Sequence, residues 1–381
     1  MKRVLILGSN NNAALSIAQD LGNDYEIFAF GFKENFNKVE YSKYLKDFKN
    51  ISNHVNIKSL TDSILKYVET KNIELIIPTN DRFTILMSLS EVRDHVGNTV
   101  ISTPEYKMLI KGMDKFESTN MVCKFGLKTP KTYTLKSFDA TSFPVYIKSR
   151  LSWVVKDDKF KSGYVKKIKS HDAFLEIKNE LKEDEVYIQE EVSGVGWGLE
   201  ILAKDGKLLN YFAHERIRES NPKGGYSSVA MSIYPNQYYI DCVEKILNEL
   251  DWTGVAMFEF KGNYKEKASF FIEMNCRFWG SLPVALHSGN RFPHLLLKVL
   301  KNETVEQVDY KEHVLAQWLQ ADIIHFFKIL MLKNRSQYNF PSVYSTFKSV
   351  FFSKMENYNK YRDDWKPDFY ELTKGFVKKI L

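Results

Sequence analysis

Two acidic residues and one amide near the middle of the chain have the types and spacing of a magnesium site. Glu259 lies in the apolar run 254–261, and Glu273 and Asn275 end a second apolar run, 268–275. We expect two strands joined by a polar turn, so that Glu273 and Asn275 share one face. Buried carboxylates need a cation, and Mg²⁺ prefers oxygen ligands. The alternative is that these are solvent-facing residues of an antiparallel sheet.

Basic residues that suit phosphate or carboxylate groups accompany this pattern. Arg277 continues the face of Asn275 if the strand persists, and its planar guanidinium can contact phosphate or a substrate carboxylate. Lys148 lies in the strand-like segment 144–149 and is a candidate phosphate ligand. Lys115 is a similar candidate on a helix. Taken alone, each lysine is more simply explained as an edge or solvated residue.

The segment Tyr187–Gly194 is typical of a strand that ends in a hinge. Its acidic residues and final glycine suit a hinge whose backbone groups contact a purine, although the motif is weak in isolation. Arg216 and Arg218 follow later in a charged stretch. Without further information, they are ordinary charged residues of a strand-to-loop segment.

The first hundred residues predict an open, doubly wound parallel sheet, because short apolar strands alternate with helices. The first loop, GSNNNA, lacks the GxGxxG pattern, which makes an NAD(P) site improbable. The expected strands are Val4–Leu7, Tyr25–Gly31 and Leu75–Pro78, and the expected helices are Ala13–Leu21, Ser59–Thr70 and Asp81–Leu89.

The following segments predict a small α+β unit and then an antiparallel sheet. The turn Asp205-Gly206 favours a hairpin between its flanking strands. We expect helices at Lys107–Leu127, His171–Leu181 and Tyr238–Leu250, and strands at Pro144–Ser149, Lys159–Lys169, Val186–Val192, Trp197–Leu202 and Lys207–His214. The predicted domains are 1–112 (parallel sheet), 113–192 (small lid), 193–301 (antiparallel sheet with the metal site) and 302–381 (helical, aromatic and basic extension).

The extension begins with a strongly apolar stretch, Val314–Leu332. Its polar positions fall on a common arc at 100° per residue, which predicts an amphipathic helix. The favoured interpretation is a helix packed on the main body. The alternative is a membrane-surface helix followed by the basic residues Lys333 and Arg335.

Bulk composition sets limits on partners and compartment. The chain has 381 residues and a formal net charge of +7, which suits an anionic ligand, but no Lys/Arg block indicates nucleic acid. Three widely spaced cysteines do not form a disulfide framework, so a cytoplasmic location is expected. The sequence contains no apolar stretch of about 20 residues free of charge, so no transmembrane helix is expected.

The order of these segments resembles the ATP-grasp superfamily. The run Phe271–Gly289, FIEMNCRFWGSLPVALHSG, looks like its hallmark E-x-N-x-R-F-W-G-S, and is closest to the carbamoyl-phosphate-synthase-like and predicted carboligase branch. Supporting segments occur upstream in the right order and extend the resemblance over roughly residues 1–300. They are IIPTNDRF, DKFESTNMVCKFGLKTPKT, PVYIKS, YIQEEVSG and GVAMFEFK.

The resemblance implies a role for each candidate residue. Lys115 and Lys148 would contact the ATP phosphates, and Arg277 would stabilise the transferring phosphoryl group or an acyl phosphate. Arg216 and Arg218 would lie near the phosphates or the acceptor. The adenine hinge would be Glu190, Glu191 and Val192, and the Mg²⁺ or Mn²⁺ ligands would be Glu259, Glu273 and Asn275. The residues expected to act in catalysis are Arg277, Lys148 and Arg216.

One segment departs from the family pattern. Many relatives have a glycine-rich lid loop after the residue corresponding to Lys148, whereas here only Gly163 is present. Lid contacts to ATP would therefore use Ser149, Ser152 or Trp153.

The implied activity is ATP-dependent ligation of a carboxylate to an amine through an acyl phosphate, with release of ADP and phosphate. The alternatives are a thiol or hydroxyl acceptor, phosphoryl transfer alone, or a non-catalytic nucleotide-binding protein. Related ligases act in amino-acid, peptide, cofactor and surface-polysaccharide pathways, so the resemblance leaves the acid and amine substrates open. A homodimer and peripheral membrane contact through the extension are further expectations.

Overall fold

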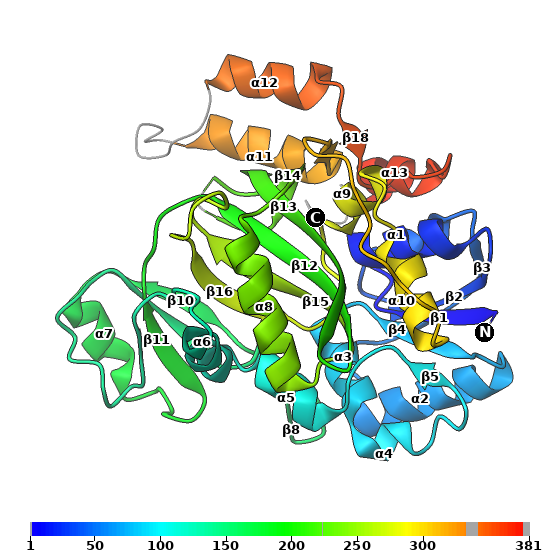
Figure 1. Ribbon diagram of the computed structural model, residues 1–381, viewed down its shortest axis with the longest axis horizontal. Helices are drawn as coiled ribbons and strands as arrows, with labels where there is room; N and C mark the ends of the chain where they lie inside the picture. Colours follow the sequence, from blue (N-terminus) through cyan, green and yellow to red (C-terminus); the bar gives the residue numbers. More distant parts are fainter. Residues whose placement is uncertain (1, 223, 333–341, 376–381) are drawn as a thin grey trace.

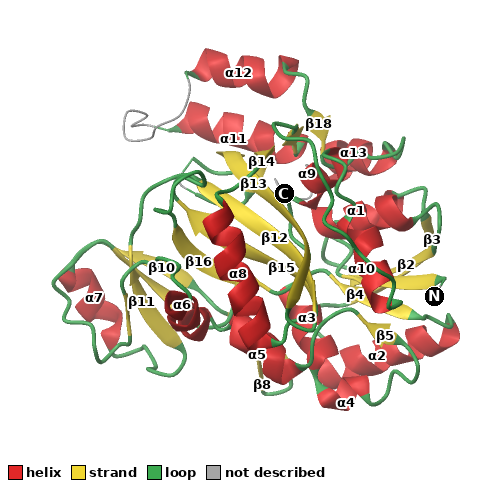
Figure 2. Ribbon diagram, viewed as in Figure 1, coloured by secondary structure: helices red, strands yellow, loops and turns green. Residues whose placement is uncertain are grey.

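The computed structural model describes residues 2–222, 224–332 and 342–375. Within them, the strands form a parallel sheet, a small antiparallel sheet, a large sheet and a separate two-stranded hairpin (Figure 2). Figure 1 shows the parallel sheet and the small sheet on opposite sides of the large sheet, which lies between them. The large sheet is therefore the element that both flanking units can use to position a common site.

The first sheet is parallel throughout and has the strand order β3-β2-β1-β4-β5, which confirms the predicted doubly wound unit. α1 packs against α9 and α10, so a single apolar core joins this sheet to the large sheet. The strands are β1 (Arg3–Leu7), β2 (Glu26–Phe32), β3 (Leu45–Ile51), β4 (Leu75–Pro78) and β5 (Val100–Ile101). The helices are α1 (Asn12–Leu21), η1 (Lys38–Tyr41), α2 (Ile57–Thr70), α3 (Asp81–Ser88) and α4 (Ser90–Arg93).

A single helix at Lys107–Leu127 was predicted, and this prediction is wrong. The chain forms α5 (Tyr106–Met113) and α6 (Lys115–Lys124), separated by Asp114. Asp114 has an extended backbone, and its carboxylate accepts hydrogen bonds from the first turn of α6. A side-chain cap of this kind satisfies backbone N–H groups that a continuous helix would have bonded internally, so the break costs little.

The small sheet has the order β10-β7-β11-β6 and is covered by α7 (His171–Lys178). Its strands are β6 (Thr132–Tyr133), β7 (Val145–Ser149), β10 (Val165–Ile168) and β11 (Val186–Glu190). The predicted strand Lys159–Lys169 is divided, because the Gly163 backbone turns away to bond Ser152. The preceding part pairs as the hairpin β8 (Trp153–Lys156) and β9 (Lys159–Ser162).

The large sheet has the order β16-β15-β12-β13-β14-β17-β18 and carries helices on both faces. The strands are β12 (Gly196–Lys204), β13 (Lys207–Glu219), β14 (Ser227–Ile233), β15 (Gly254–Lys261), β16 (Phe270–Asn275), β17 (Leu315–Gln317) and β18 (Glu356–Asn357). α8 (Gln237–Leu250) covers one face, and α9 (Leu282–His287) and α10 (Phe292–Leu300) pack in the core on the other.

The C-terminal extension contributes α11 (Leu319–Met331), α12 (Val343–Phe352), α13 (Lys366–Tyr370) and the π-helical turn η3 (Glu371–Gly375). The predicted helix Val314–Leu332 begins only at Leu319, because Leu315–Gln317 pairs with β14 as a strand. Lys333 and Arg335 lie outside the described residues. In the described part of the chain, no helix combines the length and apolarity needed to cross a membrane.

α11 packs on the body as predicted, but it does so through its polar arc. Gln320, Asp322 and His325 are buried against the body, whereas Phe327 and Met331 are exposed. The buried polar groups are tolerated because β13, β17 and η3 supply partners for Asp322 and Gln320. The helix therefore leaves much of its apolar face outside the core.

Candidate functional site

The two predicted acidic residues face each other across neighbouring strands. In the register of β15 and β16, Glu259 lies directly opposite Glu273. The side-chain amide of Asn275 donates hydrogen bonds to both, at 3.1 Å to Glu259 Oε1 and 3.2 Å to Glu273 Oε1. Opposed like charges are destabilising in a sheet. The three side chains therefore form an oxygen-rich cluster that favours a cation.

Two cationic groups contact these carboxylates directly. Arg216 Nη2 lies 2.6 Å from Glu259 Oε2, and the charge of Glu259 raises the pKa of the guanidinium. Lys115 Nζ lies 3.6 Å from Glu273 Oε2 and donates to Ser152 Oγ at 2.7 Å. The predicted lid residue Ser152 is thus held beside the cluster through Lys115.

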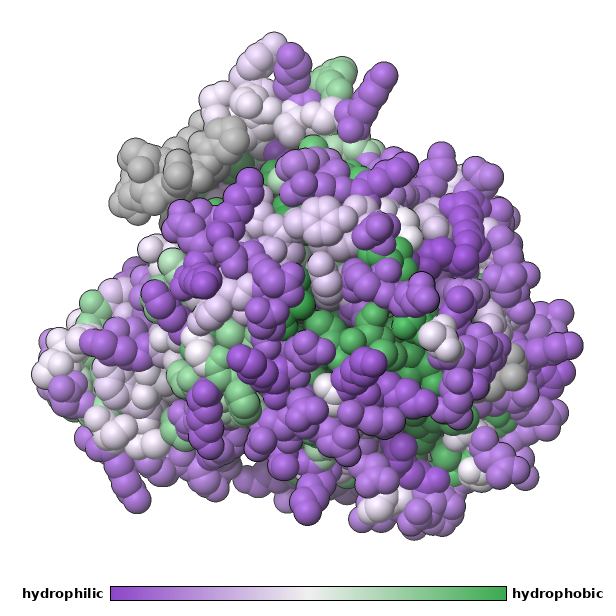
Figure 3. Space-filling model, viewed as in Figure 1, coloured by the Kyte–Doolittle hydropathy of each residue, from purple (hydrophilic) through white to green (hydrophobic). Residues whose placement is uncertain are grey.

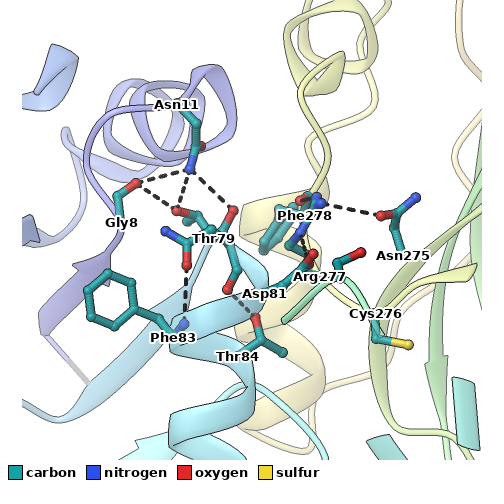
Figure 4. A network of polar contacts seen from close by, with 12 residues as sticks. Gly8, Asn11, Thr79, Asp81, Phe83, Thr84, Asn275, Cys276, Arg277 and Phe278 are labelled. Atoms are coloured by element: carbon teal, nitrogen blue, oxygen red, sulfur yellow. Dashed lines mark hydrogen bonds and ion pairs between the residues drawn. The ribbon is translucent and has the colours of Figure 1, made fainter. Parts of the chain in front are cut away.

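Arg277 joins the cluster to the parallel sheet. Its Nη2 donates to Asn275 Oδ1 at 3.2 Å, and its Nε donates to Asp81 Oδ1 at 2.5 Å (Figure 4). Asp81 is the first residue of α3, whose N-terminus Asn80 caps. Burial would lower the pKa of the Arg277 guanidinium, but the carboxylate of Asp81 outweighs burial and raises it. Arg277 therefore stays cationic, with its guanidinium bound on two sides.

Lys148 approaches from the small sheet. Its Nζ donates to Gln189 Oε1 at 2.7 Å, and Gln189 lies on the adjacent strand β11. Burial is the main cause that lowers the pKa of Lys148 to about 8; Glu273 acts in the opposite direction, and Lys115 acts in the same direction as burial. An anionic ligand close to Lys148 would restore its charge, as expected for a phosphate-binding lysine.

The cations also determine the ionisation of Glu273. Burial alone would raise the pKa of its carboxyl, but Lys115, Lys148 and the Asn275 amide outweigh this effect and hold the pKa below its usual range. Glu273 is therefore ionised at neutral pH, which is the state that a metal ligand requires.

Two glycines on β12 leave the space that the side chains around Glu259 occupy. Gly196 and Gly198 point toward the same face of the sheet as Glu259, and Trp197 between them points into the opposite core. A Cβ at Gly196 would lie 3.0 Å from Cδ of Arg216, and one at Gly198 would lie 2.7 Å from Cε1 of His214. Side chains of β13 therefore cross over β12 through space that only glycine leaves open.

A second set of polar residues, centred on His214, was not predicted from the sequence. Its Nδ1 lies 2.5 Å from Glu200 Oε1, and its Nε2 lies 3.1 Å from Ser281 Oγ. All three residues are buried. Alternation along β12 places Glu200 on the face of Gly198, which is a signal that the sequence contains. The pairing with His214 needed the register of β12 and β13.

One cavity adjoins the acidic cluster, and a second cavity neighbours the first. The inner cavity, of about 210 Å³, is lined by Arg216, Arg277, Ser281, the acidic cluster and His214. The outer cavity, of about 440 Å³, is lined by the loop after β1, by 34–38 and by the C-terminal extension. The two share lining residues, which are Asn12, Tyr226, Gly280 and Trp318. Together they offer room for a small polar substrate.

The predicted adenine hinge lies at a separate cavity. Glu190, Glu191 and Val192 line a space of about 730 Å³ next to Lys261. Tyr133 donates to Glu190 at 2.8 Å. Lys167 donates to Glu191 at 2.6 Å and holds the pKa of that carboxyl below its usual range. Both acidic side chains are therefore bound to protein partners.

Arg218 does not join Arg216 at the acidic cluster. The register of β13 against β14 shifts between the two arginines, and Arg218 instead binds Asp322 of α11. Arg218 therefore pairs with the C-terminal extension and not with the acidic cluster. The same strand supplies one arginine to the candidate site and another to the attachment of the extension.

The hairpin after Lys148 lies against the parallel-sheet unit. The Ile57 backbone donates to the Asp158 carbonyl at 2.9 Å, and the Trp153 ring lies under Arg82 at 4.8 Å. The Ser149 hydroxyl accepts from the Tyr164 backbone. Among the described contacts of the three predicted lid residues, the bond from Lys115 to Ser152 is the one that reaches a cation of the site.

The donor set of the cluster fits Mg²⁺ or Mn²⁺. Two carboxylates are hard ligands, and Asn275 would add an amide oxygen by turning its amide over, because here its nitrogen faces the carboxylates and its Oδ1 accepts from Arg277. These ligands leave coordination positions for phosphate and water. Among the described residues, no group of three or more His, Cys, Asp or Glu side chains could hold a metal ion by itself. A metal bound here would accordingly need Asn275 and oxygens of its substrate.

Comparisons with known proteins give matches at the level of structure. No protein-family model matches the sequence, and no curated protein matches it either. Pyruvate carboxylase from Rhizobium etli is similar to 83% of this chain with a TM-score of 0.62 and 15% identity. This chain spans only 30% of that enzyme's length.

Two further structures match over most of their own length. The biotin carboxylase domain of Hydrogenobacter thermophilus 2-oxoglutarate carboxylase, solved with MgADP, ADP and bicarbonate, has a TM-score of 0.60 and 15% identity over 82% of this chain and 73% of its own. An L-amino acid ligase from Bacillus licheniformis has a TM-score of 0.57 and 13% identity over 78% and 73%. The chain has the ATP-grasp fold. This confirms the predicted fold class, in which the ATP-grasp elements follow an N-terminal parallel sheet.

Proposed function

We propose that this chain is an ATP-dependent ligase that activates a substrate carboxylate as an acyl phosphate and joins it to an amine, releasing ADP and phosphate. We further propose that it belongs to the carbamoyl-phosphate-synthase-like, predicted carboligase branch of the ATP-grasp superfamily. The named ligase and the MgADP-bound carboxylase among its structural neighbours support this class of reaction.

One observation carries the proposal. The opposed carboxylates of Glu259 and Glu273 lie among the cations Lys115, Arg216 and Arg277, beside a cavity of about 210 Å³. Lys148 adds a fourth positive charge when protonated. Several cations that converge on two opposed carboxylates are suited to a triphosphate whose charge is already partly offset by a metal.

Each residue would then act by positioning and by electrostatics. Glu259, Glu273 and Asn275 would hold Mg²⁺ or Mn²⁺, which when bound offsets charge on the phosphates and orients them. Lys115 and Lys148 would contact the ATP phosphates.

The arginines would act on the substrate side of the same site. Arg277 would hold the substrate carboxylate in line with the γ-phosphate, with its guanidinium fixed by Asp81. Arg216 would stabilise charge on the transferring phosphoryl group from the wall of the inner cavity. Because both guanidiniums are already positioned, little rearrangement accompanies the phosphoryl transfer.

The adenine would lie at the cavity beside Glu190, Glu191 and Val192, with residues 113–192 acting as the lid over ATP. This division follows the proposed domains 1–112, 113–192, 193–301 and 302–381. A cytoplasmic location is consistent with three cysteines that are all free thiols, and we propose a homodimer as the default assembly.

The decisive experiment screens acids for ATP-dependent activation. The twenty common amino acids, glucuronic acid and galacturonic acid would be incubated with Mg-ATP and hydroxylamine, which captures acyl phosphates as hydroxamates. The expected result is a hydroxamate with ADP release for at least one acid. ADP release without capture would indicate phosphoryl transfer to another group. ATP binding without any turnover across the panel would contradict the ligase proposal.

A further inference from the structure

A continuous row of side-chain positions connects the acidic cluster to a buried histidine. In the registers of β16, β15, β12 and β13, the row reads Glu273, Glu259, Gly198 and His214. Positions in one row share a face of the sheet and are spaced by about 4.8 Å. Because Gly198 has no side chain, the imidazole of His214 occupies the space above it, on the side toward Glu259.

Glu200 behind this histidine is costly to bury. Its side chain is fully buried, and burial raises the pKa of the carboxyl against the opposite effect of His214. Its Oε1 contacts His214, whereas its Oε2 has no hydrogen-bond partner among the described residues. A partly satisfied buried carboxylate destabilises a fold. Such a group is expected where it serves a reaction.

The row ends at the inner cavity. His214 and Ser281 both line it, together with Glu259 and Glu273. From these contacts we infer that Ser281, His214 and Glu200 form a proton relay that deprotonates the amine substrate. The inference rests on the proposed ligase function, which it deepens by assigning the base for the second half-reaction.

The chemistry of the step balances without another reagent. The amine enters as an ammonium group, and one proton passes through the Ser281 hydroxyl to Nε2 of His214. The carboxylate of Glu200 stabilises the imidazolium. The free nitrogen lone pair attacks the acyl carbon, and the carbon–oxygen bond to phosphate breaks with its electron pair on phosphate. The departing phosphate takes the second nitrogen proton, and His214 returns its proton to water after product release.

Hydroxylamine separates this role from the first half-reaction, because it is uncharged at neutral pH and needs no base before attack. With the acid identified by the hydroxamate screen, His214→Gln should retain hydroxamate formation within about threefold. It should lose at least about 100-fold in amide formation with the same panel of amino acids as amines. His313→Gln, at an exposed histidine, is the matched control.

Gly198→Ala tests the geometry independently. The strand backbone accepts alanine, but the added Cβ would approach Cε1 of His214 to 2.7 Å and displace the ring. The same selective loss of amide formation is expected. Equal losses of hydroxamate and amide in both variants would show a structural role and overturn the inference, as would full amide formation by His214→Gln. Absence of hydroxamate in the unmodified protein would instead refute the ligase function and, with it, this relay.

A second inference comes from a different region, the outward apolar face of α11 and α12. Met331, Tyr344 and Phe352 are 79%, 75% and 71% exposed, and Phe327 and Phe351 are also exposed. α12 packs on α11 and projects from the body at the top of the molecule (Figure 3). Clustered exposed aromatic residues of this kind mark an interaction surface.

The charge of this surface indicates its partner. Lys348 and Lys354 are exposed on α12 and on the segment that follows it, whereas Lys328 donates to the Ser220 carbonyl of the body. Residues 323–332 and 342–355 contain no acidic residue. A symmetric dimer through this surface would bring like charges together. We propose that the surface binds an anionic membrane, because aromatic side chains insert at the interface while lysines contact lipid headgroups.

Vesicle sedimentation tests this proposal without reference to enzymatic activity. The full chain should bind vesicles of phosphatidylserine and phosphatidylcholine but not pure phosphatidylcholine. The double variant Tyr344→Ser, Phe352→Ser should weaken binding at least about tenfold, and Lys348→Glu should weaken it about fivefold or more. Tyr106→Ser removes an aromatic residue that is 40% exposed on α5, outside this surface, and should leave binding unchanged.

Three outcomes would overturn the membrane assignment. The first is equal binding to charged and uncharged vesicles, and the second is binding to neither. The third is a concentration-dependent dimer that the Tyr344→Ser, Phe352→Ser variant abolishes, which would identify a second copy of the chain as the partner.

Discussion

Two buried charged clusters originate from a single strand, and they differ in how charge is balanced. Arg216 on β13 reaches the candidate metal cluster, whereas Arg218, two residues later, binds Asp322 on α11. Each oxygen of Asp322 accepts from Arg218 and from one further donor, Ser228 or Gln317. The Asp322 cluster is thus neutral and satisfied.

The metal cluster is organised in the opposite way. Glu259 and Glu273 oppose each other as like charges, one amide serves both, and the nearby Arg216 and Arg277 are shared with the further carboxylates Glu219 and Asp81. The difference shows that burial of charge does not by itself indicate function. A satisfied cluster attaches one element to another, whereas an unbalanced cluster beside a cavity is prepared for a charged ligand.

The largest expected effect comes from removing one of the opposed carboxylates. Glu273→Gln should lower ATP turnover by more than about 100-fold, because a metal ligand is lost. The midpoint of thermal unfolding should not fall, since repulsion with Glu259 is relieved. Steady-state ADP release and thermal scanning measure the two effects. Glu176→Gln, at an exposed position, is the control, and unchanged turnover would contradict the metal assignment.

Removing a charge from the Asp322 cluster should lower the stability of the fold. Asp322→Ala leaves the buried guanidinium of Arg218 unpaired, which should lower the free energy of unfolding by about 3–5 kcal/mol. Chemical denaturation measures this value, with exposed Asp309→Ala as the comparison. A loss below about 1 kcal/mol would show that the pair contributes little to stability. It would contradict the structural role assigned to the Asp322 cluster.

Lys148 gives the metal cluster a pH dependence. Its pKa of about 8 lies below the unfolded value of 10.5, so the unfolded chain binds more protons between these values and stability should rise with pH there. ATP binding needs the charged form. Affinity for a non-hydrolysable ATP analogue should therefore fall about tenfold as pH increases from about 7 to 9.5.

Calorimetric titration at several pH values would measure the affinity of this analogue. Lys148→Met should bind weakly at neutral pH and show a flat profile over the same range. A decline of equal steepness in this variant would assign the titration to another group.

The smallest effect should come from the hinge, where charge is again satisfied. Glu191 pairs with Lys167 and Tyr146 at the surface, and such pairs contribute less than about 1 kcal/mol. Glu191→Ala should therefore change the KM for ATP by less than about threefold. A tenfold increase would show that the side chain itself, rather than the backbone, contacts the nucleotide.

The sequence by itself determined the local chemistry of the metal cluster. Strand alternation placed Glu273 and Asn275 on one face, and apolar runs located most strands of the parallel sheet. At Asp114, periodicity alone predicted one helix, although Asp114 followed by Glu117 is the pattern of a helix start, and the Asp114 side chain caps a second helix there. Local patterns report propensity and periodicity, and capping competes with both.

Only the tertiary structure decided which distant residues meet. The row from Glu273 to His214 depends on three strand registers. The glycines of β12 matter only because side chains of the neighbouring strand β13 lie over them. The apolar face of α11 likewise points outward because Asp322, on the opposite face, pairs with Arg218 in the body. Periodicity shows that a helix has two faces, but which face is buried depends on the partners that the rest of the chain supplies.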